Sequence, residues 1–590
     1  MMEVFLFQIV WENRGITRSF ISLLLSYGGV IVNRQLKKIL SCVLTTVILI
    51  ASVPVAAFGG VAPLKITVAA DTHFQCAADL GDFSDQYTEY MLEPELFGYA
   101  STQGQMPYES EAILCEMLAE FEASDAECLL IAGDLTCGKR ASHLAFAQHL
   151  RQTEESSGKR IFVINGNHDC DAEGSDTGIS MEEFREIYAD FGYNEAIARH
   201  EGSASYAADL NGAYRLLAID TCIYGEDEGR ISADVFRWIK AQVKQAKADG
   251  KTPVAMMHHS LLPHYELQPM IDLWQFYAGW FADHGIQTVF TGHIHANDIS
   301  STVTDCGNTV YDIQTGALIA SPNTYREITF SDDAVTVESR FITKIDPSRL
   351  PSQLTAAQRA RLAEDFPAYA RAYFENGVCK WMNRNLGSVN RLARWFRLKE
   401  GTTAFTAAEK LMKTVGAAVG QDIYGDGNGR SIEAALSPYG ITVPESDYIK
   451  PYQVAAKLMY GFFYGDEDAA GNEADAKLLL ACLEGAVLTA LNDGFSESSL
   501  RALASALSGD DALTKRIAAM PVSILKRQIA EKTALSLLET FTGGFIDDYS
   551  APEDLNVTLP TGKTTNAVTL HVLIRIFRLF AELLNRLFNV

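Results

Sequence analysis

Five short apolar segments of the chain are each followed at once by side chains that can bind a metal ion. The segments span 64–70, 128–132, 160–165, 252–257 and 286–291. The candidate ligands after them are, in chain order, Asp71 and His73, then Asp134, Asn167 and His258, and finally His293 and His295. Carboxylates, imidazoles and an amide oxygen form the mixed nitrogen and oxygen ligand set that suits Mn, Fe or Zn. Such residues at the end of every segment predict a metal site.

The elements around these residues predict how they are brought together. From 64 to about 345, short β-rich runs alternate with longer helical runs such as 111–123 and 232–248, which predicts an α/β domain of packed layers. Two further segments, 205–220 and 325–342, have the pattern of β-hairpins. Because loops at the carboxyl ends of strands in open α/β sheets converge on one crevice, we expect the five polar segments to meet there.

The order and spacing of these segments closely resemble the calcineurin-like metallophosphoesterase family, whose motifs run DxH, GDxx, GNH[DE], H and GHxH. In this chain the motifs read Asp71-Thr72-His73, Gly133-Asp134, Gly166-Asn167-His168-Asp169, His258 and Gly292-His293-Ile294-His295. One such motif would be weak evidence, but five in the right order are specific. The resemblance covers roughly 64–320 and implies a four-layer α/β/β/α sandwich.

The same resemblance implies a centre of two divalent or trivalent metal ions, Mn, Fe or Zn. Its seven ligands would be Asp71, His73 and His295 on one ion, Asn167, His258 and His293 on the other, and Asp134 on both. Two such ions share a water and depress its pKa, so the resulting hydroxide would attack phosphorus in line. For the pair His258-His259 the sequence alone leaves the ligand ambiguous, and the family pattern favours His258.

Two neighbouring residues would complete the chemistry. By resemblance His168 is a general acid that donates a proton to the leaving oxygen, and Asp169 orients its neighbours. The chain is therefore expected to be a metallophosphoesterase acting on a small phosphorylated substrate, with phosphomonoesterase and phosphodiesterase activity both open.

Cys137 is a departure from the family pattern. Three residues after the bridging Asp, many relatives carry Asp or Asn, and the purple acid phosphatase branch carries a metal-bound Tyr. The absence of Tyr argues against a purple iron chromophore, and the absence of Asp leaves the partner of His168 unidentified. Cys137 could bind a metal as a thiolate or pack as a neutral side chain.

Charge and the N-terminal segment bear on partners and localisation. The formal net charge of −25 makes bulk binding of nucleic acid unfavourable. A basic segment, an apolar run at 39–53 and small residues up to Ala57 predict a signal peptide at about 33–57, after an upstream segment at 1–32. We expect export to the cell envelope or beyond, with an uncleaved anchor as the alternative.

The domain plan follows from the change of pattern near 345–355. We expect a metallophosphoesterase domain at 64–345, a helical domain at 355–565 and an amphipathic helix at 567–590. This last helix could dock on a membrane surface or envelope, or close the helical core. The segment 422–433 partly fits a calcium loop but favours a polar turn, and the segment 76–110 could roof the crevice or be a structural flap.

A function from a different class is also open. The helical domain and the tail could bind a partner at the cell envelope, so that the protein would be an adaptor with a vestigial metal centre. Proteins of that kind should have lost ligands or the acid histidine, and this sequence keeps all of them.

Overall fold

The computed structural model describes residues 63–81, 104–171, 177–265, 268–386, 398–425, 430–465, 473–508, 516, 519–543 and 554–562. The predicted signal segment at 33–57, the residues before it, most of the segment 76–110 and the amphipathic segment 567–590 lie outside these ranges. None of the described helices combines the length and the apolar character that crossing a membrane requires.

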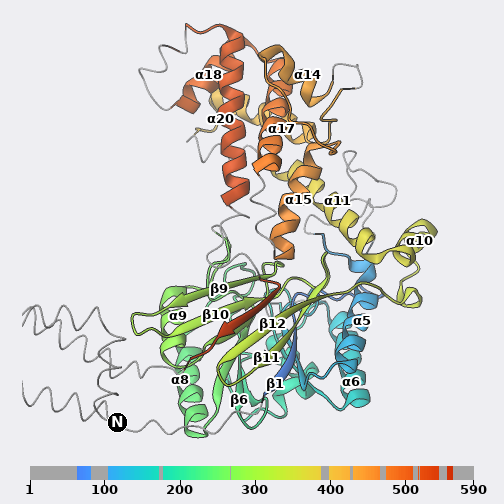
Figure 1. Ribbon diagram of the computed structural model, residues 1–590, viewed down its shortest axis with the longest axis vertical. Helices are drawn as coiled ribbons and strands as arrows, with labels where there is room; N and C mark the ends of the chain where they lie inside the picture. Colours follow the sequence, from blue (N-terminus) through green and yellow to red (C-terminus); the bar gives the residue numbers. More distant parts are fainter. Residues whose placement is uncertain are drawn as a thin grey trace, which may run out of the picture. The chain divides into compact units, whose positions relative to one another are not determined.

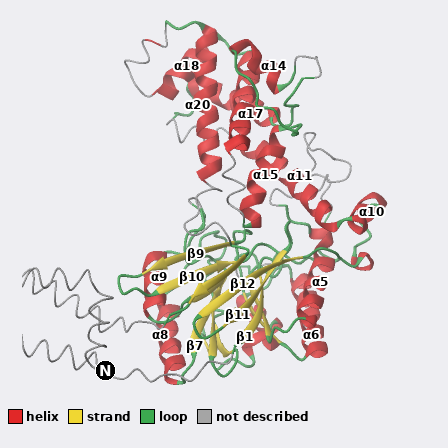
Figure 2. Ribbon diagram, in the orientation of Figure 1, coloured by secondary structure: helices red, strands yellow, loops and turns green. Residues whose placement is uncertain are grey.

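Two mixed β-sheets form the core of the α/β part of the chain (Figures 1 and 2). In the described residues the first sheet has the spatial order β13 (Asn556–Pro560), β12 (Ala334–Phe341), β11 (Thr324–Phe330), β1 (Leu64–Ala69), β2 (Cys128–Ala132) and β3 (Arg160–Ile164). The second has the order β4 (Ala198–Arg199), β5 (Tyr206–Asp209), β6 (Tyr214–Ile219), β7 (Thr252–Met257), β8 (Thr288–Thr291), β10 (Thr309–Gln314) and β9 (Asp298–Val303).

The strand directions place the predicted polar segments at two sheet edges. Strands β1, β2 and β3 are parallel, and so are β6, β7 and β8. The two predicted hairpins are confirmed, because β5 pairs antiparallel with β6 and β11 pairs antiparallel with β12. All five predicted strands are present, and each ends within two residues of a predicted metal ligand or of its motif.

Alternation of side chains along the strands explains the layers. In β7, Val254 and Met256 belong to a core shared by both sheets, whereas Ala255 and Met257 belong to the core under the helices of the second sheet. The second sheet is covered by α8 (Ala233–Ala248) and α9 (Trp274–Asp283) (Figure 1). The first is covered by α5 (Ser110–Ala123) and α6 (Arg140–Ser157), with the short α7 (Met181–Ile187) after β3. The result is the four-layer α/β/β/α sandwich.

Local sequence signals set where the helices begin. Helix α8 starts after Ser232, whose hydroxyl accepts a hydrogen bond from the backbone N–H of Val235, and Asp234 lies in its first turn. Helix α10 (Ala356–Glu364) starts with a capping box in which Thr355 and Gln358 each bond the backbone of the other. These side chains satisfy backbone groups that the helix itself leaves unpaired.

The region after the sandwich is helical, as predicted. The described part contains α10 (Ala356–Glu364), α11 (Phe366–Leu386), α13 (Thr403–Ala418), α14 (Ile432–Leu436), α15 (Pro451–Tyr464), α17 (Glu473–Asn492), α18 (Glu497–Ser508) and α20 (Val522–Gly543). Its apolar side chains form a core of their own, which begins in α11.

Several contacts attach this helical region to the sandwich. The hydroxyl of Tyr369 donates to Glu109 Oε1 over 2.7 Å, and the backbone N–H of Asn297 donates to the carbonyl of Phe463 over 3.2 Å. After α20 the chain also returns to the first sheet as β13, which pairs antiparallel with β12. This strand lies within the range 355–565, which was predicted to be helical.

The calcium-like segment 422–433 has contacts of a different kind. Lys450 Nζ lies 3.2 Å from the carboxylate of Asp422, and Glu433 Oε2 accepts a hydrogen bond from the backbone of Gly425. Residues 426–429 of this segment lie outside the described ranges. An ammonium group at the first candidate ligand position favours the polar turn over a calcium loop.

Candidate metal centre

The loops that carry the predicted ligands are bonded to one another at the carboxyl ends of the strands. The N–H of Asp71 donates to the carbonyl of Gly133 over 3.2 Å, which joins the loops after β1 and β2. The N–H of Gly292 donates to the carbonyl of His258 over 3.0 Å, which joins the loops after β7 and β8. The N–H of His293 then donates to Asp71 Oδ2 over 2.9 Å, so the two sheets meet at this point.

The backbone at the site has an unusual conformation. Among the described residues, the non-glycine residues with φ in the left-handed region are Asp71, His73, Asp134, His293 and His295 at the site, and Leu273 and Asn323 elsewhere. Such conformations cost free energy and persist only where the surroundings enforce them, most often at functional sites. Five of the seven predicted ligands are therefore held in strained turns directly after their strands.

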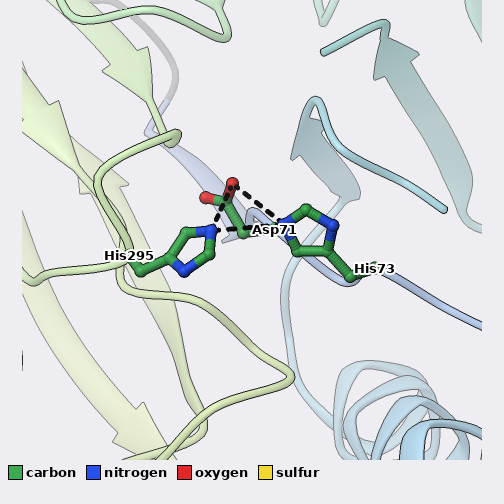
Figure 3. Close-up of side chains that lie close together, drawn as sticks. All are labelled: Asp71, His73 and His295. Atoms are coloured by element: carbon green, nitrogen blue, oxygen red, sulfur yellow. Dashed lines mark hydrogen bonds and ion pairs between the residues drawn. The ribbon is translucent and has the colours of Figure 1, made fainter. Parts of the chain in front are cut away.

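One group of side chains consists of Asp71, His73 and His295 (Figure 3). The Nε2 atoms of His73 and His295 lie 3.2 Å apart. Asp71 Oδ1 lies 3.5 Å from His295 Nε2 and 3.9 Å from His73 Nε2. The carboxylate comes from the loop after β1 and His295 from the loop after β8, so each sheet contributes to this group.

A second group consists of Asp71, Asp134 and His258, so Asp71 belongs to both groups. Asp134 Oδ2 lies 3.3 Å from His258 Nε2 and 3.5 Å from His73 Nε2, so this carboxylate reaches both groups. Asn167 Oδ1 lies 3.0 Å from the same nitrogen of His258. The positions of Asp134 and Asn167 agree with the roles that the family resemblance implies for them, which stay predictions.

His293 lies beside the second group. Its ring centre is 5.0 Å from that of His258 and 4.5 Å from that of His259. It belongs to neither of the described groups of His, Cys, Asp and Glu ligand atoms that lie within 4.8 Å of one another. Its backbone, by contrast, is tightly tied to Asp71, and its side chain lines the cavity at the site.

Burial makes the electrostatics of the site strong. Asp71 and His258 are 0% exposed and Asp134 is 1% exposed. Burial lowers the pKa of His73 to about 4 in spite of the nearby carboxylates, which leaves a neutral imidazole. Burial also acts to lower the pKa of His258, but Asp134 outweighs it and raises that pKa to about 9. In turn, His258 holds the pKa of Asp134 well below its ordinary value against the effect of burial.

The donor set fits metal ions. Buried carboxylates need a positive counterpart, and among the described residues Asp71 and Asp134 have ion-pair contacts only with histidines, not with Lys or Arg. Two imidazole nitrogens that face each other across 3.2 Å are well placed to share a cation. A metal ion would replace the proton that His258 otherwise carries.

His168 and Asp169, the two predicted catalytic residues, have different surroundings. His168 is exposed and lines the cavity, and its ring centre is 5.4 Å from that of His73. No hydrogen bond to its imidazole occurs within the described residues, while its backbone N–H donates to Asp134 Oδ1 over 2.9 Å. The fold therefore places His168 beside the predicted metal ligands and outside both groups.

Asp169 is fully buried and is not among the residues that line the cavity. Its carboxylate accepts hydrogen bonds from the backbone N–H groups of Leu135, Thr136 and Gly166 over 2.8 to 3.1 Å. Burial and the nearby Asp134 raise its pKa to about 7. These bonds fasten the loop after β2 to the loop after β3, which is a positioning function.

The two ambiguous residues of the sequence analysis lie outside both groups. His259 is buried, with Nδ1 2.8 Å from Thr221 Oγ1 and its ring against that of His293. Cys137 Sγ lies 4.0 Å from His73 Nδ1, on the side of the imidazole away from His295. Cys137 is exposed as a residue, but its sulfur lies beside His73, and the partial loss of water around the thiol together with Asp134 and Asp169 raises its pKa to about 12, which favours the neutral thiol.

Two features of the site were not found from the sequence. A buried cluster of His264, Asp298 and Asp312 anchors the segment after His258, with His264 Nδ1 3.0 Å from Asp298 and Nε2 3.3 Å from Asp312. The second is a wall of helical residues over the cavity, described below. The cluster could have been suspected from His264 six residues after His258, but nothing in the sequence marks the wall.

The comparison with known proteins agrees with this geometry. A model of the calcineurin-like phosphoesterase family matches residues 64–297. A search of curated proteins finds no match. One similar solved structure is a dimetal phosphatase from Danio rerio, with 10% identity over 47% of this chain and 96% of that one and a TM-score of 0.35.

In two other similar structures, the likeness covers only about half of the other chain. A purple acid phosphatase from yellow lupin seeds has 12% identity over 48% of this chain and 52% of that one, with a TM-score of 0.30. The NAD nucleotidase of Haemophilus influenzae has 12% identity over 48% of this chain and 50% of that one, with a TM-score of 0.27. Scores this low carry no conclusion about activity. With its motifs, its four layers and the family match, the part of the chain from 64 to 297 is a calcineurin-like phosphoesterase domain.

Proposed function

We propose that the protein is a hydrolase of phosphoric esters that depends on two metal ions. Asp71, His73 and His295 would hold one ion, Asn167, His258 and His293 would hold the other, and Asp134 would bind both. When bound, two such ions supply Lewis acidity, since they neutralise charge on the phosphoryl oxygens and make water a stronger nucleophile at neutral pH. The preference for monoesters or diesters stays open.

The protein's own residues would position the substrate and move a proton. Because His168 is exposed at the cavity and close to His73, a ring nitrogen of His168 can donate its proton to the leaving oxygen. Its backbone bond to Asp134 couples its position to the shared ligand. Asp169 would keep the loops after β2 and β3 in register, so that Asp134 and Asn167 face the same space.

The observation that carries the proposal is the position of Asp134. Its carboxylate lies within 3.5 Å of histidines from both groups, as a shared ligand requires. Strained turns at Asp71, His73 and Asp134 cost stability and persist most often at functional sites, which favours a working centre over a vestigial one.

The test uses full-length protein loaded with Mn, Fe or Zn and assayed with p-nitrophenyl phosphate and bis(p-nitrophenyl) phosphate. We expect hydrolysis of at least one ester, and a fall in kcat of about 10²–10⁴-fold in His168→Ala with the metal content unchanged. His200→Ala, at the residue directly after β4, is the matched control. Absence of hydrolysis with every metal would favour the adaptor, and full activity in His168→Ala would remove the acid role.

Export and the tail belong to the same proposal. The apolar run and small residues before Phe58 support a cleaved signal, so the secreted protein would begin near that residue, as N-terminal sequencing would show. The amphipathic helical pattern at 567–590 supports contact with a membrane surface or envelope. Unchanged liposome binding after deletion of this segment would dismiss that contact.

A further inference from the structure

A cavity with a volume of about 260 Å³ opens over the candidate metal centre. One side of it is polar and consists of Asp134, Asn167, His168, His293 and His295. These residues come from the loops after β2, β3 and β8 and belong to the phosphoesterase domain. This is the side at which a phosphoryl group would lie.

The other side of the cavity comes from the helical region. Phe374, Val378 and Trp381 project from α11, and Met459 and Phe462 project from α15. The two helices pack side by side. Phe374 and Val378 are each 2% exposed, and Phe462 packs against Tyr265 with ring centres 5.7 Å apart. The polar centre therefore faces a continuous apolar and aromatic wall.

The wall is anchored close to a predicted ligand. Asn297 lies two residues after His295, and its backbone N–H donates to the carbonyl of Phe463 over 3.2 Å. Its side-chain amide donates to the carbonyl of Tyr464 over 3.3 Å, and its Oδ1 accepts from the N–H of Gly316 over 3.0 Å. These bonds hold the end of α15 at a fixed place relative to the metal centre, so the wall is part of the site.

The charge of the lining restricts the ligand further. No Lys or Arg occurs among the described residues that line the cavity, and Asp227 is the one carboxylate there besides Asp134. Among the described residues, the cavity therefore offers no cationic side chain to a substrate with several phosphates. An apolar group would instead exchange water for aromatic and aliphatic side chains.

We infer that the helical region forms a substrate subsite for an apolar organic group, so that the preferred substrates are phosphate esters of aliphatic or aromatic alcohols with one phosphoryl group. Only the part of the inference that concerns the phosphoryl end of the substrate rests on the proposed function. It gives the helical region a role in choosing the substrate.

The main experiment measures kcat/KM of the Mn-loaded full-length protein for linear alkyl phosphates from methyl to octyl. The chemistry of the leaving group changes little along this series, so the buried apolar area is the variable. We expect kcat/KM to rise about threefold to fourfold with each added methylene until the cavity is filled. Values that stay constant or fall with chain length overturn the inference.

Variants of the wall residues test where the alkyl chain of the substrate binds. Trp381→Ala is expected to lower the octyl-to-methyl ratio of kcat/KM by roughly tenfold. Val378→Trp should reduce the chain length at which kcat/KM stops rising, because it fills the cavity. The matched control is Phe276→Ala, at a 55% exposed aromatic on α9. Thermal unfolding of each variant separates a lost subsite from a lost fold, and a folded Trp381→Ala with an unchanged ratio overturns the inference.

Binding of alkylphosphonates, measured by calorimetry, gives a readout that needs no turnover. The affinity for the alkylphosphonates should rise about threefold to fourfold with each added methylene, and Trp381→Ala should reduce this rise. If aryl phosphates are hydrolysed but neither series depends on chain length, the subsite is wrong and the proposed function stands. If no ester is hydrolysed but phosphonate affinity rises with length, the subsite stands and the proposed function is wrong.

Discussion

Replacement of Gly292 by alanine tests how closely the loops pack around the metal centre. A Cβ atom at Gly292 would lie 2.5 Å from Asp71 Oδ2 and 2.8 Å from the Cβ of Ala70. An ordinary contact begins at 3.4 Å, so Asp71 would have to move by about 1 Å. Ala70 follows directly on β1 and cannot give way easily, which leaves the carboxylate of Asp71 as the group that shifts.

The size of the effect follows from the tolerance of metal sites. Ligand distances in such sites vary by about 0.2 Å, and a misplacement of 1 Å in an active site can cost about 10²-fold in rate. We therefore expect Gly292→Ala to lose at least one metal ion and to lower kcat for aryl phosphates about 10²-fold. The added atom should also reduce the free energy of unfolding by about 1–3 kcal/mol.

The assay combines metal analysis by mass spectrometry after dialysis, steady-state kinetics and chemical denaturation. Gly212→Ala is the control, because it lies in the turn between β5 and β6, has no atom within 4 Å of an added Cβ, and has a φ outside the left-handed region. We expect this control to keep its metal content and its activity. Full metal content and full kcat in Gly292→Ala would contradict the close packing of Gly292 against Asp71 and Ala70.

Three further outcomes are expected. Asp169→Asn should lower the free energy of unfolding by about 2–4 kcal/mol in denaturation experiments, because an amide cannot accept all three backbone hydrogen bonds; an unchanged stability would contradict the role of Asp169. Burial acts to lower the pKa of His264, but Asp298 and Asp312 outweigh this effect and raise the pKa to about 10. The pairing of His264 with these two carboxylates therefore stabilises the fold fully below about pH 6.5, and this stabilisation is lost as the pH rises towards 10. The stability difference between wild type and His264→Gln should therefore shrink from pH 7 to pH 10, and a constant difference would argue against the ion pairs. Removal of metal with a chelator should lower the Tm by several degrees, since ligands at about 100 times their Kd add about 2.7 kcal/mol, and an unchanged Tm would indicate an empty centre.

The sequence predicted the α/β layers and the convergence of the site because both depend on local patterns, whereas the four-layer sandwich was implied by the family resemblance. Each strand either alternates between polar and apolar residues or is apolar throughout, and each ends at a polar motif. Because the carboxyl ends of such strands meet at one crevice, this pattern places Asp71, Asp134 and His258 close together. The left-handed φ of Asp71 and His73 was not predictable, because non-glycine residues rarely adopt it.

What the sequence did not predict depends on contacts between distant segments. Strand β13 pairs with β12 across more than 200 residues, and a strand of five residues has no clear signal of its own. The apolar residues of α11 and α15 have the spacing of ordinary core helices, and some of them do belong to the helical core. Only the folded chain shows that Val378 and Met459 also face the cavity.

The central claim is that two metal ions share Asp134. Anomalous diffraction from crystals of the Mn-loaded protein tests it most directly. We predict two peaks, one beside Asp71, His73 and His295 and one beside Asn167, His258 and His293, with Asp134 in contact with both. A single peak, or peaks elsewhere on the protein, would contradict the two-metal centre.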